Sequence, residues 1–107
     1  MQTYPLFKLA DIPDGAARGF EVGDTDGFVV RQGDTVYAYR NVCPHAGNNL
    51  DWKPDAFLTR DKSRIMCAAH GALFDIQSGD CVAGPCVGFG LQTLDVRVEA
   101  NDVVLYQ

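Results

Sequence analysis

Two short boxes in this 107-residue chain each combine a cysteine with a histidine. The first is Cys43-Pro44-His45, and the second is Cys67-Ala68-Ala69-His70. One thiolate and one imidazole from each box could together hold a tetrahedral zinc ion. The same four groups could instead bind a cluster of two irons and two sulfides, in which two histidines replace two cysteines on one iron. The residue types therefore point to a metal centre of one of these two kinds.

The mixed composition of each box favours the cluster. Zinc fingers usually pair cysteine with cysteine and histidine with histidine. Here each of two loops can give a sulfur to one iron and a nitrogen to the other. The chain has only two histidines, and both stand shortly after a cysteine and shortly before a glycine. We predict that the metal ligands are Cys43, His45, Cys67 and His70.

The sequence resembles the Rieske iron–sulfur proteins in four successive elements. Residues 43–47 (CPHAG) match the family's C-x-H box, and residues 67–75 (CAAHGALFD) match C-x-x-H-G and the start of F-D-x-x-x-G. Ser78-Gly79 and then Gly84-Pro85 complete the pattern. The resemblance implies one [2Fe-2S] cluster per chain, with both cysteines on one iron and both histidines on the other. It also implies cluster-binding loops at about residues 43–50, 67–74 and 82–87.

Several further residues should surround the cluster. Gly47 and Gly71 would allow tight turns with positive φ, in which backbone N–H groups can donate to the cluster sulfurs. By resemblance, Gly84-Pro85 would form the third loop covering the cluster; its other interpretation is a simple turn between strands. The predicted surrounding residues are Gly47, Gly71, Ala72, Phe74 and Pro85.

Four positions separate this chain from the high-potential members of the family. Those proteins have a disulfide between two loop cysteines, where this chain has Asn48 and Ala69. They also place a serine and a tyrosine as donors to sulfur, where this chain has Ala72 and Phe74. Fewer donors stabilise the reduced cluster less, so the reduction potential should be low. The resemblance is to the ferredoxin-type branch.

Length and composition indicate one domain, residues 1–107, with an ordinary hydrophobic content of 47%. No apolar run is long enough to span a membrane, and the start of the chain lacks the features of a signal peptide. We therefore expect a cytoplasmic protein. The net charge of −5 disfavours nucleic acid and suits a partner with a basic docking face.

The hydrophobic pattern predicts an all-β fold, a small antiparallel sandwich or barrel with a loop-rich tip that binds the cluster. Residues 28–31 and 36–40 should form a hairpin, and residues 94–98 and 103–106 should form another. Shorter strands are expected at residues 4–9, 20–22, 64–66 and 72–76. Between the boxes, Trp52 and Phe57 should anchor an irregular connection to the core.

The function predicted is one-electron transfer rather than catalysis. Both histidines are committed to the cluster, so the mononuclear iron site of Rieske oxygenases cannot be built. By resemblance, the chain would be a soluble ferredoxin that passes electrons from a flavin reductase to a terminal oxygenase. Two alternatives stay open: a small subunit of a nitrite-reductase-like complex, and a zinc-stapled structural or interaction module.

Two expectations concern residues outside the ligand set. Cys81 and Cys86 should be free, partly buried thiols in a reducing compartment, or one of them could approach the cluster and alter its polarity. For docking, Asp51 and Asp55 should lie at the tip. The acidic residues Glu21, Asp24 and Asp26 should lie away from it.

Overall fold

The computed structural model describes residues 2–44, 47, 49–51, 53, 55–68 and 71–107. Within these ranges, nine β-strands and one 3-10 helix (Leu9–Asp11) make up the regular structure. No helix among the described residues is long and apolar enough to cross a membrane. The strands are β1 (Thr3–Lys8), β2 (Ala17–Val22), β3 (Thr25–Gln32), β4 (Thr35–Arg40), β5 (Ile65–Met66), β6 (Leu73–Phe74), β7 (Cys81–Ala83), β8 (Thr93–Glu99) and β9 (Asp102–Tyr106).

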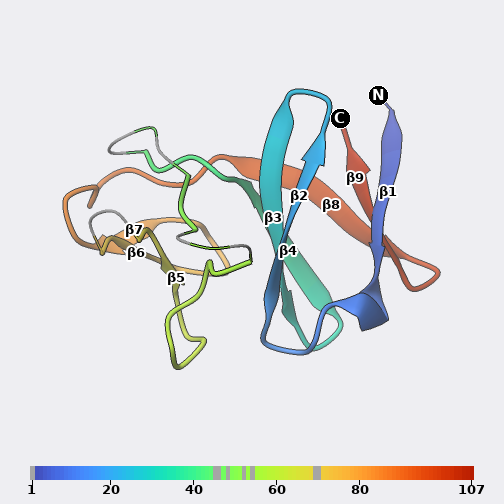
Figure 1. The fold of residues 1–107 in the computed structure, drawn as a ribbon, viewed down its shortest axis with the longest axis horizontal. Helices are drawn as coiled ribbons and strands as arrows, with labels where there is room; N and C mark the ends of the chain where they lie inside the picture. Colours follow the sequence, from blue (N-terminus) through green and yellow to red (C-terminus); the bar gives the residue numbers. More distant parts are fainter. Residues whose placement is uncertain (1, 45–46, 48, 52, 54, 69–70) are drawn as a thin grey trace.

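Six strands form one curved antiparallel sheet in the order β1-β9-β8-β4-β3-β2 (Figure 1). Its two edge strands approach each other. Phe7 of β1 meets Phe20 of β2 edge to face, with ring centroids 6.5 Å apart, and the Arg18 guanidinium lies 4.6 Å from the Phe7 centroid. The sheet is therefore a nearly closed barrel. Its interior is filled by Leu9, Ile12, Val29, Ala38 and Val103.

The middle of β3 is buried on both faces, which explains its run of three consecutive apolar residues. Phe28, Val29 and Val30 are all fully buried. Successive strand residues point to opposite faces, so Val29 packs inside the barrel while Phe28 and Val30 pack into a second core outside it. This outer face of the hairpin is the platform for the rest of the molecule.

The second core lies between that platform and a three-stranded sheet, β5-β6-β7, which stands to one side of the barrel in Figure 1. Phe57 stacks on Phe28 with centroids 4.3 Å apart and an interplanar angle of 10°. The Tyr39 hydroxyl of β4 donates to the Ile76 carbonyl at 2.6 Å. These contacts fix the small sheet and its loops to the barrel.

The all-β architecture and both predicted hairpins are confirmed, with strand bounds slightly wider than expected. Phe57 packs in the core as predicted, while Trp52 lies outside the described residues. Two details differ from expectation. The strand expected over residues 72–76 is only Leu73–Phe74, and the strand Cys81–Ala83 was not predicted. Its pairing with β6 is a tertiary contact that local patterns do not encode.

Candidate metal centre

The first predicted ligand, Cys43, lies three residues after the end of β4. The strand ends at Arg40, and Asn41 and Val42 lead into the cysteine. Cys43 is 1% exposed and belongs to the second core. β4 therefore delivers the start of the first loop, residues 43–50, to the edge of the buried cluster of side chains.

The Asn41 side chain forms hydrogen bonds with the end of this loop. Asn41 was not among the site residues predicted from the sequence. Its side-chain oxygen accepts from the Leu50 N–H at 2.7 Å, and its side-chain nitrogen donates to Asp51 at 2.9 Å. Its own N–H donates to the Asp26 carbonyl at 2.8 Å. The 3% exposed amide thus ties the two ends of the first loop together. A polar residue two positions before the Cys-x-His box was the signal available in the sequence.

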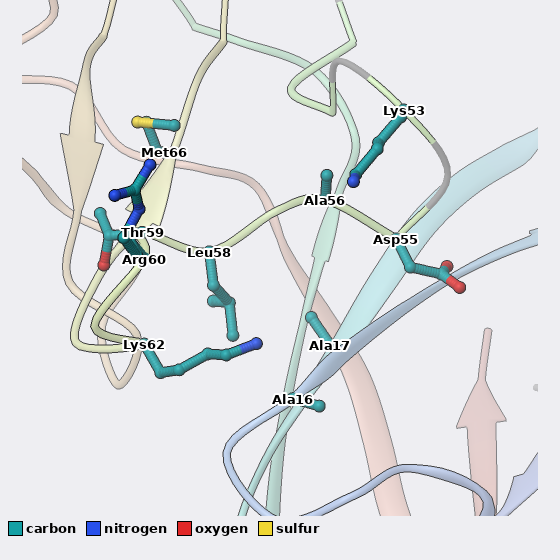
Figure 2. A pocket seen from close by; sticks show the side chains of 10 residues that line it. All are labelled: Ala16, Ala17, Lys53, Asp55, Ala56, Leu58, Thr59, Arg60, Lys62 and Met66. Atoms are coloured by element: carbon teal, nitrogen blue, oxygen red, sulfur yellow. The ribbon is translucent and has the colours of Figure 1, made fainter.

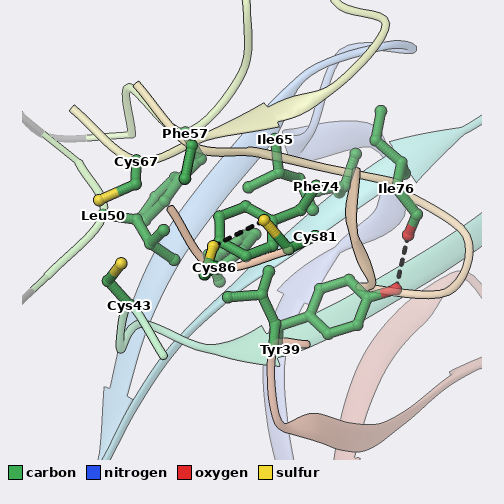
Figure 3. Close-up of a cluster of buried hydrophobic side chains, with 14 residues drawn as sticks. Tyr39, Cys43, Leu50, Phe57, Ile65, Cys67, Phe74, Ile76, Cys81 and Cys86 are labelled. Carbon is green, nitrogen blue, oxygen red and sulfur yellow. Dashed lines mark hydrogen bonds between the residues drawn. The ribbon is translucent and has the colours of Figure 1, made fainter. Parts of the chain in front are cut away.

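The second loop, residues 67–74, starts with Cys67 directly after β5. Cys67 is fully buried, and its N–H donates to the Ala72 carbonyl at 2.9 Å, which closes the loop over four residues. The Ala68 N–H donates to the Leu50 carbonyl at 3.0 Å, so the second loop is bonded to the end of the first. Figure 3 shows Cys43 and Cys67 at the same end of the buried cluster, near Leu50.

The two loops repeat one turn geometry. The Gly47 N–H donates to the Cys43 carbonyl at 2.8 Å, and the Gly71 N–H donates to the Cys67 carbonyl at 2.9 Å. The φ angles of the two glycines are +73° and +67°, as the sequence predicted. Because the Gly47 and Gly71 N–H groups already donate to these carbonyls, any hydrogen bond to a cluster sulfur would have to come from another N–H group of the turns.

The third loop, residues 82–87, packs on the second. Gly84 has a φ of +96°, and a Cβ placed on it would come within 2.9 Å of the Ala72 Cα. Only glycine allows this approach without a shift of the backbone. Ala72 and Phe74 are fully buried, whereas Pro85 is exposed. Gly84 thus allows the third loop to pack closely against the backbone of the second loop.

The two cysteines outside the predicted ligand set, Cys81 and Cys86, lie at the base of the third loop with their side chains facing each other. Cys86 is fully buried and Cys81 is 6% exposed, and their sulfurs lie 2.6 Å apart. Burial raises the pKa of the Cys86 thiol to about 12, with further contributions from Cys81 and then from Cys43. Both thiols share one buried cluster with Cys43 and Cys67 (Figure 3). Both thiols are unbridged in this structure, and both are buried rather than partly buried as the sequence predicted.

Two hollows flank the connection between the boxes. One, of about 300 Å³, is lined by Glu21, Asp26, Asp51 and Asp55. The prediction that Glu21 and Asp26 lie away from Asp51 and Asp55 is therefore wrong. The cause is the β3–β4 register, which pairs Gly27 with Arg40 and so brings Asp26 opposite Asn41 at the base of the first loop. Burial and then Glu21 raise the pKa of Asp26.

The other hollow, of about 550 Å³, is basic. Figure 2 shows its lining, which includes Lys53, Arg60 and Lys62. Asp55 also borders it, but its carboxylate accepts from the Gly19 N–H at 2.7 Å and points away from the hollow. The connection between the two boxes therefore separates a negatively charged hollow from a positively charged one.

The chemistry of the donors fits an iron–sulfur cluster. Cys43 and Cys67 are buried, and hydrogen bonds join the loops that hold them, so two thiolates can approach one metal with water excluded. The predicted nitrogen ligands, His45 and His70, lie outside the described residues, as do Asn48 and Ala69. Among the described residues, no group of three or more metal-ligating side chains offers an alternative site.

A family model decides the identity of the domain. The Rieske [2Fe-2S] domain model matches residues 2–103. The chain belongs to the Rieske family. Its cofactor is accordingly a Rieske [2Fe-2S] cluster, and the zinc-stapled module proposed as an alternative is set aside.

Solved structures extend the similarity to nearly the whole chain. The ferredoxin of carbazole 1,9a-dioxygenase from Nocardioides aromaticivorans IC177 is 30% identical, with a TM-score of 0.81 over 98% of this Rieske chain and 97% of that one. A ferredoxin–oxygenase complex of carbazole 1,9a-dioxygenase gives 26% identity and a TM-score of 0.78, over 96% and 91%.

Curated relatives are longer than this Rieske chain. The alkene monooxygenase ferredoxin component of Xanthobacter autotrophicus (strain ATCC BAA-1158 / Py2) is 29% identical over 89% of this chain and 73% of its own length. The cytochrome b6-f complex iron-sulfur subunit of Chlorobaculum thiosulfatiphilum is 26% identical over 92% of this chain. The chain spans only 50% of that subunit's length.

Proposed function

We propose that this Rieske protein is the ferredoxin component of an oxygenase system, and that it passes single electrons from a flavin reductase to a terminal oxygenase. The observation that supports this most is the match over nearly its whole length to a dioxygenase ferredoxin. A carrier of this kind needs a cluster site and a docking surface but no catalytic site of its own. The proposed setting is the cytoplasm.

In this proposal, Cys43 and Cys67 bind one iron and His45 and His70 bind the other. When bound, the cluster accepts and releases one electron at a time. The chain holds both cysteines in buried, hydrogen-bonded turns, so the sulfur side of the site is shielded from water. In this proposal the histidine side of the cluster faces the partner, because the cysteine side is buried in the second core.

Two further residues near the site, Ala72 and Phe74, should give the cluster a low reduction potential. Ala72 and Phe74 are buried and carry no O–H group that could donate to a sulfur. Fewer donors leave the reduced cluster less stable, so the midpoint should lie near the low end of the Rieske range, about −150 mV. Protein-film voltammetry measures it, and a midpoint above about +100 mV would contradict the argument from missing donors.

Metal analysis tests the ligand set. The purified protein should contain two irons and two acid-labile sulfides per chain, as a [2Fe-2S] cluster requires. His45→Ala and His70→Ala should each lose the cluster, because an open ligand position exposes iron to water. Cys81→Ala removes a cysteine outside the ligand set and should retain iron. One zinc and no iron in the wild-type protein would overturn the proposal.

Electron transfer tests the role. The holoprotein is reduced with dithionite and mixed in a stopped-flow instrument with an oxidised Rieske-type terminal oxygenase. The visible absorption of the two clusters is then followed, because it recovers in the donor as it oxidises and bleaches in the acceptor as it is reduced. Transfer to the oxygenase supports the ferredoxin role. Stable co-purification with a large oxidoreductase subunit, without transfer to any oxygenase, would favour the nitrite-reductase-like alternative.

A further inference from the structure

Cys81 directly before the third loop and Cys86 within it are two cysteines that the cluster site does not use. Cys81 is the first residue of β7 and pairs with Phe74 of β6. Cys86 follows it after four intervening residues. Their sulfur atoms lie 2.6 Å apart, compared with about 2.0 Å in a disulfide. In Figure 3 the two side chains point toward each other within the buried cluster.

Backbone hydrogen bonds hold the two cysteines in this position. The Cys81 N–H donates to the Phe89 carbonyl at 2.9 Å, and the Phe89 N–H donates to the Cys86 carbonyl at 2.9 Å. Between the cysteines, Gly84 sits against Ala72 of the second loop. The segment is therefore fixed at both ends and at its centre, so the sulfurs can join with little movement of the backbone.

We propose that Cys81 and Cys86 form a reversible disulfide that closes the third loop at its base. The oxidant is a low-molecular-weight disulfide such as oxidised glutathione. One cysteine thiolate attacks the small disulfide and releases one reduced thiol, which leaves a mixed disulfide. The second cysteine thiolate then attacks that bond and releases the other thiol. Two cysteine thiols are oxidised, and one small disulfide is reduced to two thiols that take up the protons.

Burial of the pair determines how the exchange proceeds. Only a thiolate attacks a disulfide, and a buried thiol is a poor source of it. Both sulfurs become accessible when the third loop lifts away from Ala72. Exchange should therefore be slow in the closed protein in both directions and should accelerate when low urea concentrations favour opening of the loop.

Differential alkylation of the holoprotein tests the proposal. Samples are equilibrated in glutathione buffers of increasing oxidised fraction at sub-denaturing urea, starting from reduced and from oxidised protein, while the visible cluster bands are monitored. They are then unfolded in denaturant at neutral pH with excess N-ethylmaleimide, which alkylates every remaining thiol, and mapped by mass spectrometry. We expect the reactive cysteines to fall from the four of the sequence to Cys43 and Cys67 alone. Dithiothreitol should restore all four.

A matched variant and the peptide map separate this result from others. The double substitution Cys81→Ala and Cys86→Ala should show the same two reactive cysteines in every buffer. In wild type, a linked peptide joining Cys81 to Cys86 supports the proposal. Four reactive cysteines at every oxidised fraction would overturn it, and so would a bridge that involves Cys43 or Cys67 while the cluster bands persist.

Discussion

At the scale of single residues, Asn41 controls the first loop without being a ligand. Its side chain bonds the Leu50 N–H and the Asp51 carboxylate, and Leu50 in turn accepts from Ala68 of the second loop. One buried amide therefore links β4 to both cluster-binding loops. Removal of its side chain leaves the buried Leu50 N–H without its acceptor.

We expect Asn41→Ala to lower the free energy of unfolding by about 1–3 kcal/mol, the cost of an unsatisfied buried donor. The visible cluster bands should also decay faster in the presence of an iron chelator. Asn49→Ala is the matched control, because Asn49 lies in the same loop and is exposed. Urea unfolding and chelator kinetics measure both effects. Equal behaviour of the two variants would show that Asn41 does not hold the loop.

Tyr39 gives a second prediction at this scale. Burial, with Asp75 nearby, raises the pKa of Tyr39 from 10.0 to about 12. The folded protein thus holds this proton more tightly than the unfolded chain. The stability that Tyr39 contributes is complete below pH 10 and is lost as the pH rises toward 12. The tyrosinate absorbance of wild type minus that of Tyr39→Phe should titrate near pH 12. A difference curve centred near pH 10 would contradict this assignment.

At the scale of elements, the two equivalent turns of the cluster-binding loops each require a glycine. Gly47 and Gly71 have positive φ, yet a Cβ on either would meet no atom within 4 Å. Their requirement is therefore one of backbone conformation and not of space. Gly33, in the β3–β4 turn at the far end of β4 from Cys43, has the same property with a φ of +63°.

This equivalence provides a controlled experiment. Gly47→Ala, Gly71→Ala and Gly33→Ala should each reduce the free energy of unfolding by about 1–2 kcal/mol, the cost of a left-handed non-glycine residue. Only the first two should accelerate chelator-induced loss of the visible bands, because only they distort a cluster-binding turn. Faster loss in Gly33→Ala would mean that cluster retention follows global stability instead.

The same elements show what the sequence could and could not predict. Alternating apolar residues and a short Gly-containing turn were sufficient for the β3–β4 hairpin, and the boxes with their glycines were sufficient for two loops. The hydrogen bond between Asn41 and the Leu50 N–H, and the pairing of the strand Cys81–Ala83, both depend on partners more than five residues away. Local patterns contain no information about such contacts. The position of Asp26 beside Asp51 combines the β3–β4 register, which places Asp26 opposite Asn41, with the hydrogen bond from Asn41 to Asp51. The second contact was missed for the same reason.

At the scale of the whole molecule, the net charge of −5 is unevenly distributed around the site. The acidic hollow borders the base of the first cluster-binding loop, because Asn41 joins Asp26 and Asp51 there. The basic hollow lies on the other side of the connection and contains Arg60 and Lys62. A partner with a basic docking face would thus be attracted to the acidic side, next to the first loop.

The distribution of charge predicts how electron transfer depends on salt. Asp26→Asn with Asp51→Asn should slow second-order transfer to such a partner by up to about tenfold at low salt, because the attraction that speeds encounter is reduced. Arg60→Gln with Lys62→Gln removes two charges of the opposite sign and should leave the rate unchanged or raise it. Added salt should bring all rates together, since exposed charges are screened beyond about 8 Å at physiological ionic strength. Stopped-flow rates across a salt series measure this. If both double variants slow transfer equally, the acidic hollow does not guide docking, and the exposed apolar residues beside the cluster loops, Val42, Val82, Val87 and Phe89, become the stronger candidates.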